Sequence, residues 1–225
     1  MRQAEPVRPG APGAACPQRR KAVFIDRDGT LTEPRHYPCC PDDLVLQPDI
    51  GPPLRALQHA HWALVVVTNQ SGVARGLFTA NALETMHERL GALLASHGVR
   101  LHGIYACPHH PDGTVPGYRG PCSCRKPAPG MLHQAAHDLE LDLTRSWTVG
   151  DSPCDIAAGR TAGTRTALVG THPRGRQLPD AHCATTAEAL HLVLRSRATR
   201  ARAGHLTGDW RGATTTGVHG KVSER

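Results

Sequence analysis

Two carboxylates, Asp26 and Asp28, stand two residues apart in the string DRDGT at residues 26–30, directly after an apolar run. Gly29 permits the chain to curl there, so that both carboxylates can turn toward one cation. Magnesium favours a few hard oxygen ligands together with water and phosphate oxygens. One carboxylate can attack phosphorus while the other protonates the leaving oxygen and later activates water. The string therefore indicates magnesium-dependent phosphoryl transfer, although a solvated acidic turn has the same composition.

Three thiols and an imidazole form a second constellation between residues 107 and 124. They match a structural zinc site in ligand number and softness. The Cys-x-His and Cys-x-Cys spacings are tighter than usual and require an irregular backbone. His110 can replace His109, so the choice of imidazole stays open, and reduced cysteines in a loop are the alternative. The predicted ligands are Cys107, His109, Cys122 and Cys124.

Short apolar strands alternate with helical patterns between residues 22 and 194, which predicts βαβ units and a Rossmann-like parallel sheet with helices on both faces. Residues 107–127 have neither period and read as an insertion. The expected strands are 22–25, 63–67, 101–106, 147–149 and 166–169. The expected helices are about 52–60, one capped by Thr79 and ended by Gly98, about 130–139, 155–160, and a last one opened by a Thr185–Glu188 capping box.

Every candidate reactive segment is predicted to follow the carboxyl end of a strand. In open α/β sheets, ligands bind at that edge. Acidic residues with no common role would be spread over both ends of the strands. The shared placement therefore favours one active site.

The apolar strand and DRDGT string resemble the first motif of the haloacid-dehalogenase-like (HAD-like) superfamily of aspartate-nucleophile phosphatases. Three further motifs of that superfamily are matched in order, by Thr68 after the run 63–67, by Lys126, and by the acidic pair Asp151 and Asp155 after the run 147–149. The resemblance implies that Thr68 holds phosphoryl oxygens and that Lys126 offsets charge in the transition state. It implies that Asp151 completes a magnesium site.

Four strings, DRDGT at 26–30, TNQSGVARG at 68–76, CPHHP at 107–111 and CSCRKP at 122–127, resemble those of the heptose 1,7-bisphosphate 7-phosphatases. The resemblance covers residues 22–192, and in that family a zinc loop stands in for a large cap domain. The similarity implies a capless HAD-type fold with a small zinc-stapled loop. It makes Asp26 the nucleophile and Asp28 the general acid and base, with magnesium held by Asp26, the main-chain carbonyl of Asp28 and Asp151. The implied contacts to a phosphorylated sugar are Pro34, Arg35, His36, Tyr37, Asn69, Gln70, Ser71 and Arg125.

One departure concerns the residue after Asp151, which is commonly Lys in the heptose enzymes and is Ser152 here. Without a cation at this position, a weaker hold on a second phosphate is expected. Histidinol-phosphate phosphatases share the zinc loop and are the first alternative. Polynucleotide 3′-phosphatases share the Asp and Thr motifs but do not need the zinc loop. A zinc-stapled binding module without activity is the non-enzymatic alternative, and the presence of all the reactive residues argues against it.

The net charge of +7 is located in the two ends of the chain. Residues 1–21 carry five Lys/Arg and one acid, residues 195–225 carry seven and two, and residues 22–194 sum to −2. We expect a phosphatase domain at 21–194 between disordered basic tails at 1–20 and 195–225. Because the domain itself is not basic, nucleic acid is not an expected partner. With no apolar segment long enough to span a bilayer and no secretory signal, the expectation is a cytoplasmic monomer that does not bind membranes.

Overall fold

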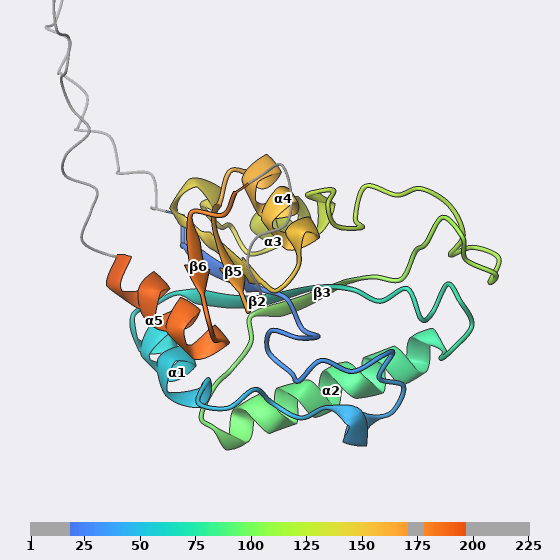
Figure 1. Cartoon of the computed structure of the whole chain (residues 1–225), viewed down its shortest axis with the longest axis horizontal. Coiled ribbons are helices and arrows are strands. Elements are labelled where there is room, and N and C mark those ends of the chain that lie inside the picture. The colour runs from blue at the N-terminus through green and yellow to red at the C-terminus, as the bar shows by residue number, and fades with distance from the viewer. Residues whose placement is uncertain (1–18, 171–177, 197–225) are drawn as a thin grey trace, which may run out of the picture.

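The computed structural model describes residues 19–170 and 178–196, so the predicted tails lie outside the described residues apart from a few positions at their inner ends. Its centre is a six-stranded sheet in the order β3-β2-β1-β4-β5-β6 (Figure 1). The strands are β1 (Ala22–Ile25), β2 (Ala63–Asn69), β3 (Gly103–Cys107), β4 (Trp147–Gly150), β5 (Arg165–Val169) and β6 (Ala181–Cys183).

All neighbouring strands of this sheet are parallel. The chain builds outward from β1 through β2 to β3, then returns to the other side of β1 and builds outward again through β4 and β5 to β6. The strand order therefore reverses between β1 and β4, as in a doubly wound fold. The predicted α/β class and parallel sheet are confirmed.

Helices cover both faces of the sheet (Figure 1). Helices α1, α2 and α5 pack against one face, and α3 and α4 against the other. The helices are α1 (Gly51–His59), α2 (Ala80–Ser96), α3 (Gly130–Asp138), α4 (Pro153–Ala162) and α5 (Thr186–Arg195), with single 3₁₀ turns at Pro41–Asp43 and Leu143–Arg145.

Strand β2 shows why an unbroken apolar run fits the middle of such a sheet. Leu64 and Val66 belong to the core under α1, α2 and α5, whereas Ala63, Val65 and Val67 belong to the core under α3 and α4. Because both faces are covered, no position in the run has to be polar. The burial of this strand holds the polar residues at its end in fixed positions.

The predicted start signals of two helices can be compared with the structure. The Thr79 side chain accepts a hydrogen bond from the N–H of Ala82 (3.1 Å) and caps α2 as expected. At α5, the Thr185 hydroxyl accepts from the N–H of Glu188 (3.2 Å). The Glu188 carboxylate, however, reaches one residue further back and accepts from Ala184 (2.8 Å), so the predicted capping box is only half formed.

Strand β6 and the start of α4 differ from expectation. Strand β6 was not predicted, because its three residues form no apolar run and only Cys183 is buried. The helix expected at 155–160 begins earlier, at Pro153, because Ser152 caps it and Asp155 closes a capping box on the N–H of Ser152 (3.1 Å). Across 19–170 and 178–196, no helix combines the length and apolar content that crossing a bilayer requires.

Candidate active site and metal centre

The carboxyl ends of three neighbouring strands bring polar side chains to one edge of the sheet. Asp26 directly follows β1, and its N–H donates to the carbonyl of Val149 on β4 (2.9 Å). Thr68 lies near the end of β2, and Asp151 directly follows β4. These predicted positions therefore meet beside the point where the strand order reverses, which is where parallel α/β sheets bind ligands.

Lys126 joins this edge from a loop. Its Nζ lies 2.6 Å from Asp26 Oδ1 and 2.6 Å from Asp155 Oδ1, and it donates to the carbonyl of Val67 on β2 (2.7 Å). Its segment follows a strand, β3, as predicted, but Lys126 lies well beyond the end of that strand, in the turn before α3. Residues 108–129 form no helix or strand, and this loop returns the lysine to the end of β2.

Asp155 is the second acid of the fourth motif, and no role of its own was predicted for it, although it pairs with Lys126 in a fully buried position. At the start of α4 it also accepts from the N–H of Ser152, which makes it look like an ordinary helix-capping residue. The available signal was the glycine two residues before Ser152. A Cβ on Gly150 would collide with the Asp155 side chain, so the strand end must be bare for the carboxylate to fit.

The electrostatics of the site are set by three carboxylates around one ammonium. Burial raises the pKa of Asp26 to about 7, against the pull of Lys126 and with the repulsion of Asp155 and Asp151. Burial, and then Asp155, also raises the pKa of Asp151. Burial alone would lower the pKa of Lys126, but Asp26 and Asp155 outweigh it and raise that pKa, so the ammonium stays charged. The remaining excess of negative charge is what a divalent cation would relieve.

The donor set fits such a cation. Asp26, Asp151 and Asp155 each offer a carboxylate oxygen, and these oxygens lie within 4.8 Å of one another. Hard oxygen ligands of this kind suit magnesium. Gly29, with φ +87°, is required beside them, because a Cβ there would collide with the Asp151 carboxylate. The glycine of the DRDGT string therefore leaves space for the side chain of Asp151, a predicted metal ligand, as well as allowing the turn.

Asp28 is not part of this cluster, and its carboxylate is held by two other side chains. Arg27 Nε and Nη2 donate to its Oδ1 (3.0 Å) and Oδ2 (2.9 Å). Gln70 Nε2 donates to the same Oδ2 (2.7 Å) and to the Thr68 hydroxyl (2.8 Å). The predicted metal contact of Asp28 through its main-chain carbonyl stays a prediction, and its carboxylate is free for another role.

Asn69, predicted to contact substrate, is engaged with the main chain of Lys126. Its Nδ2 donates to the Lys126 carbonyl (3.0 Å), and its Oδ1 accepts from the Lys126 N–H (3.0 Å). Both polar atoms of the amide are therefore used to hold the lysine. A direct contact to substrate stays a prediction for this residue.

A cavity of about 260 Å³ lies beside Asp28. It brings together most of the predicted substrate contacts, namely Arg35, His36, Tyr37, Asn69, Gln70 and Ser71. Pro34 lines a second hollow of about 320 Å³ with Gly29 and Asp151. Arg125 donates to the carbonyl of His109 (3.4 Å) and lines neither hollow. The loop 34–37 thus borders both hollows.

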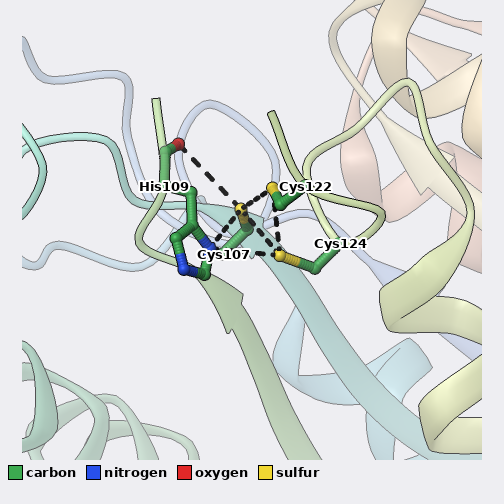
Figure 2. Close-up of side chains that lie close together, drawn as sticks. All are labelled: Cys107, His109, Cys122 and Cys124. Carbon is green, nitrogen blue, oxygen red and sulfur yellow. Dashed lines mark hydrogen bonds between the residues drawn. The ribbon is translucent and has the colours of Figure 1, made fainter. Parts of the chain in front are cut away.

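The four predicted zinc ligands converge at the end of β3 (Figure 2). The Sγ of Cys107 lies 3.1 Å from that of Cys124 and 3.5 Å from that of Cys122. His109 Nδ1 lies 3.4 Å from Cys124 Sγ. These separations approach the distance of about 3.8 Å between ligands around a tetrahedral zinc with Zn–S bonds of about 2.3 Å. Its donors are those of a structural zinc centre.

The same geometry separates the two adjacent histidines. His110 lies outside the cluster, with Nε2 3.2 Å from Arg75 Nη2. Its Nδ1 accepts from the N–H of Asp112 (3.1 Å). His109 is therefore the imidazole that the fold brings to the three thiols.

Comparison with families and curated proteins gives consistent matches. A family described as HAD-hyrolase-like matches residues 123–195. The D-glycero-beta-D-manno-heptose-1,7-bisphosphate 7-phosphatase of Yersinia pestis is 43% identical over 148 residues, which cover 66% of this chain and 79% of that protein. The protein of the same name from Rhodopseudomonas palustris is 39% identical over 149 residues, covering 66% and 83%.

Solved structures agree with these matches. The D,D-heptose 1,7-bisphosphate phosphatase of B. bronchiseptica, complexed with magnesium and phosphate, has a TM-score of 0.66 and 32% identity and covers 78% of this chain and 99% of its own. The corresponding structure from Burkholderia thailandensis has a TM-score of 0.57 and 27% identity, with the same coverage. The shared region therefore takes in nearly the whole of each of the two solved structures.

Proposed function

Because this chain belongs to the HAD-like family of phosphatases, we propose that it removes the 7-phosphate of D-glycero-D-manno-heptose 1,7-bisphosphate with magnesium as cofactor. The observation that carries the chemistry is the buried ammonium of Lys126, 2.6 Å from both Asp26 and Asp155. Identities of 39–43% to curated heptose-bisphosphate phosphatases support the substrate.

In this proposal Asp26 is the nucleophile. A carboxylate oxygen of Asp26 forms a bond to phosphorus, and the bond from phosphorus to the sugar oxygen breaks with its electron pair going to that oxygen. Lys126 stabilises the negative charge on the phosphoryl group, and Thr68 helps to hold its oxygens. The product of this step is an aspartyl-phosphate on Asp26.

Asp28 is the general acid and base. It gives its proton to the departing sugar oxygen, which leaves as a hydroxyl, and becomes a carboxylate. Water then bonds to phosphorus and gives a proton to Asp28, while the bond between Asp26 and phosphorus breaks. The net change is one water consumed for one alcohol and one phosphate released, and both aspartates return to their starting state.

Magnesium would be held by Asp26 and Asp151 together with the main-chain carbonyl of Asp28. The mutual proximity of the Asp26, Asp151 and Asp155 oxygens and their excess negative charge support a divalent cation at this edge. When bound, magnesium neutralises charge on the phosphoryl oxygens. Asp155 is already shared between Lys126 and the N–H of Ser152, so its main task is to hold the lysine.

Zinc would be held by Cys107, His109, Cys122 and Cys124 in a closed four-ligand site with a structural role. Such a site would fix the loop 108–129 on the sheet. This matters for the reaction because Lys126 lies two residues after the last ligand.

A comparison of phosphate-release rates tests the substrate. The purified chain should hydrolyse heptose 1,7-bisphosphate with a kcat/KM well above those for histidinol phosphate and for a 3′-phosphorylated oligonucleotide. The variant Ser152→Lys tests whether the lysine that the heptose enzymes commonly have at this position helps to hold the second phosphate. Heptose 7-phosphate, which lacks that phosphate, is the matched substrate. A higher rate on histidinol phosphate or on the oligonucleotide would reject the heptose assignment while leaving the phosphatase chemistry in place.

A further inference from the structure

The arginine between the two aspartates of the DRDGT string has no part in the mechanism above, yet its side chain is fully buried. Two of its nitrogens, Nε and Nη2, face the two carboxylate oxygens of Asp28 in parallel hydrogen bonds. A bidentate pair of this kind fixes the plane of the carboxylate as well as its distance. Arg27 thus constrains how Asp28 is oriented.

Stability does not account for an arginine at this position. A guanidinium keeps its charge when buried, and desolvating it is costly. Asp28 is the only ion-pair partner of Arg27 among residues 19–170 and 178–196, and Arg27 Nη1 has no hydrogen-bond partner there. Apolar side chains of similar volume often replace buried ion pairs without loss of stability. The arginine is therefore better explained by what it does to Asp28.

A neutral imidazole lies near the arginine. His87 on α2 lies close enough for the positive charge of Arg27 to act on it. Burial, and then Arg27, lowers the pKa of His87 to about 4, so the imidazole is uncharged near neutral pH. With no competing carboxylate from α2 in the described structure, the guanidinium is directed to Asp28 alone.

A second anchor acts on the same carboxylate from β2. Gln70 Nε2 donates to Asp28 Oδ2, which also accepts from Arg27 Nη2. A carboxylate has about four lone-pair positions, and these contacts occupy two on Oδ2 and one on Oδ1. The remaining position is on Oδ1. The Asp28 side chain is 26% exposed and borders the 260 Å³ cavity, so the carboxylate can be reached from the site.

We infer that Arg27 is a positioning residue: with Gln70 it orients Asp28 so that Oδ1 exchanges the proton with the leaving oxygen and with water. The inference rests on the proposed acid and base role of Asp28. Arg27 and Gln70 set the orientation of the Asp28 carboxylate, and Arg27 itself does not contact the substrate.

The need for a proton from Asp28 depends on the leaving group. A sugar alkoxide needs the proton of Asp28 as its bond to phosphorus breaks. The p-nitrophenolate ion leaves without a proton, so phosphorylation of Asp26 by p-nitrophenyl phosphate does not use Asp28 as an acid. The second step, attack of water on the aspartyl-phosphate, uses Asp28 as a base for every substrate.

The experiment uses the magnesium-loaded full chain and the variants Arg27→Met and Arg27→Lys. Rapid-quench measurements follow phosphoenzyme formation and its hydrolysis, with heptose 1,7-bisphosphate and with p-nitrophenyl phosphate. For Arg27→Met, phosphorylation by the sugar should slow by about 100-fold, the lower end of general acid–base contributions. Phosphorylation by p-nitrophenyl phosphate should change by less than about threefold, so phosphoenzyme accumulates because its hydrolysis is slowed. Arg27→Lys, which keeps the charge but offers a single donor nitrogen in place of the two that face Asp28, should restore part of the loss.

Each outcome bears on the inference. Equal losses of phosphorylation with both substrates would overturn it, since a general disturbance of the fold makes no distinction between leaving groups. A faster turnover of Arg27→Met would also overturn it, because the arginine would then be withholding Asp28. If Arg27→Met does not fold, Arg27→Lys alone decides, by showing or lacking the same leaving-group contrast. If the natural chain ignores heptose bisphosphate but cleaves another sugar phosphate, the substrate proposal fails, and the same contrast with that sugar phosphate tests Arg27.

Discussion

The side chain of Asn69 and the main chain of Lys126 form a closed ring of two hydrogen bonds, each 3.0 Å long. One partner lies at the end of β2, and the other lies just beyond the cysteine and histidine cluster. The ammonium that reaches Asp26 is therefore positioned from the sheet and from the loop at once. A disturbance of either should be felt at the site of phosphoryl transfer.

Replacing Asn69 by Ala should remove the hold from the side of the sheet. We expect kcat to fall by about tenfold or more, because even a small misplacement of a group that stabilises charge is costly. The free energy of unfolding should fall by about 1–3 kcal/mol for the unpaired main-chain groups of Lys126. Steady-state kinetics and urea unfolding measure the two effects. Asn81→Ala, on the exposed side of α2, is the matched control. Unchanged kcat in Asn69→Ala would mean that the loop alone places the lysine.

Replacing Asp26 by Asn should abolish magnesium-dependent phosphate release, since an amide does not form the acyl phosphate that the mechanism requires. The variant should still fold, because the amide still accepts a hydrogen bond from Lys126. Malachite-green phosphate detection and mass spectrometry of acid-quenched protein test the loss of turnover and of the phosphoenzyme. Asp138→Asn, at an exposed position on α3, serves as the control. Full turnover in Asp26→Asn would exclude this residue as the nucleophile.

The purified chain should contain about one zinc, the complement of a single four-ligand site. Replacing Cys124 by Ser should lower that content and lower kcat together, because the loop carrying Lys126 loses its anchor. The melting temperature should fall by several degrees, since metal binding to the folded state contributes directly to stability. Elemental analysis, kinetics and calorimetry measure these changes. Cys39→Ser, an exposed cysteine outside the cluster, should leave all three unchanged. Full zinc content in Cys124→Ser would contradict the ligand set.

His87 should make the fold sensitive to mild acid. Burial, and then Arg27, lowers its pKa from 6.5 to about 4, so the unfolded chain binds more protons than the folded one between these values. The stability that His87 confers is complete above about pH 6.5 and is lost as the pH falls toward 4, with a loss of about 2 kcal/mol between pH 7 and pH 5. In urea unfolding at pH 7 and pH 5, His87→Gln should lose less stability between the two pH values than the natural chain. His133→Gln, on the exposed face of α3, should behave like the natural chain. An equal loss in His87→Gln would assign the acid sensitivity to other groups.

Removal of residues 1–18 and 197–225 should leave hydrolysis of small phosphates nearly unchanged. The boundaries follow two contacts of the described chain: Arg20 donates to the carbonyl of His61 (3.0 Å), and Ser196 accepts from the indole of Trp147 (3.1 Å). Comparing kcat/KM for the full and trimmed chains tests this expectation. A large loss would mean that the basic ends take part in substrate binding.

The sheet and the carboxylates at its edge were predictable because their signals are local. An uninterrupted run such as Ala63–Val67 indicates a strand covered on both faces, and DRDGT directly after a strand indicates a turn at the reactive edge. The pairing of Lys126 with Asp155 was not predictable in the same way. It depends on how an irregular loop returns to the sheet, and no periodicity encodes that path. Arg27 escaped notice because a charged residue beside two acids reads as solvated, although the fold buries it completely.

Two glycines, one in the loop after β1 and one at the end of β4, should tolerate no other residue when the protein is engineered. Gly29 is pressed against Asp151, and Gly150 against Asp155, with no space for a Cβ at either position. In a library in which every residue is varied and the survivors are selected for turnover, both positions should accept glycine alone. Neither glycine supplies an atom to the reaction, so such a screen would report them as essential for the room they leave.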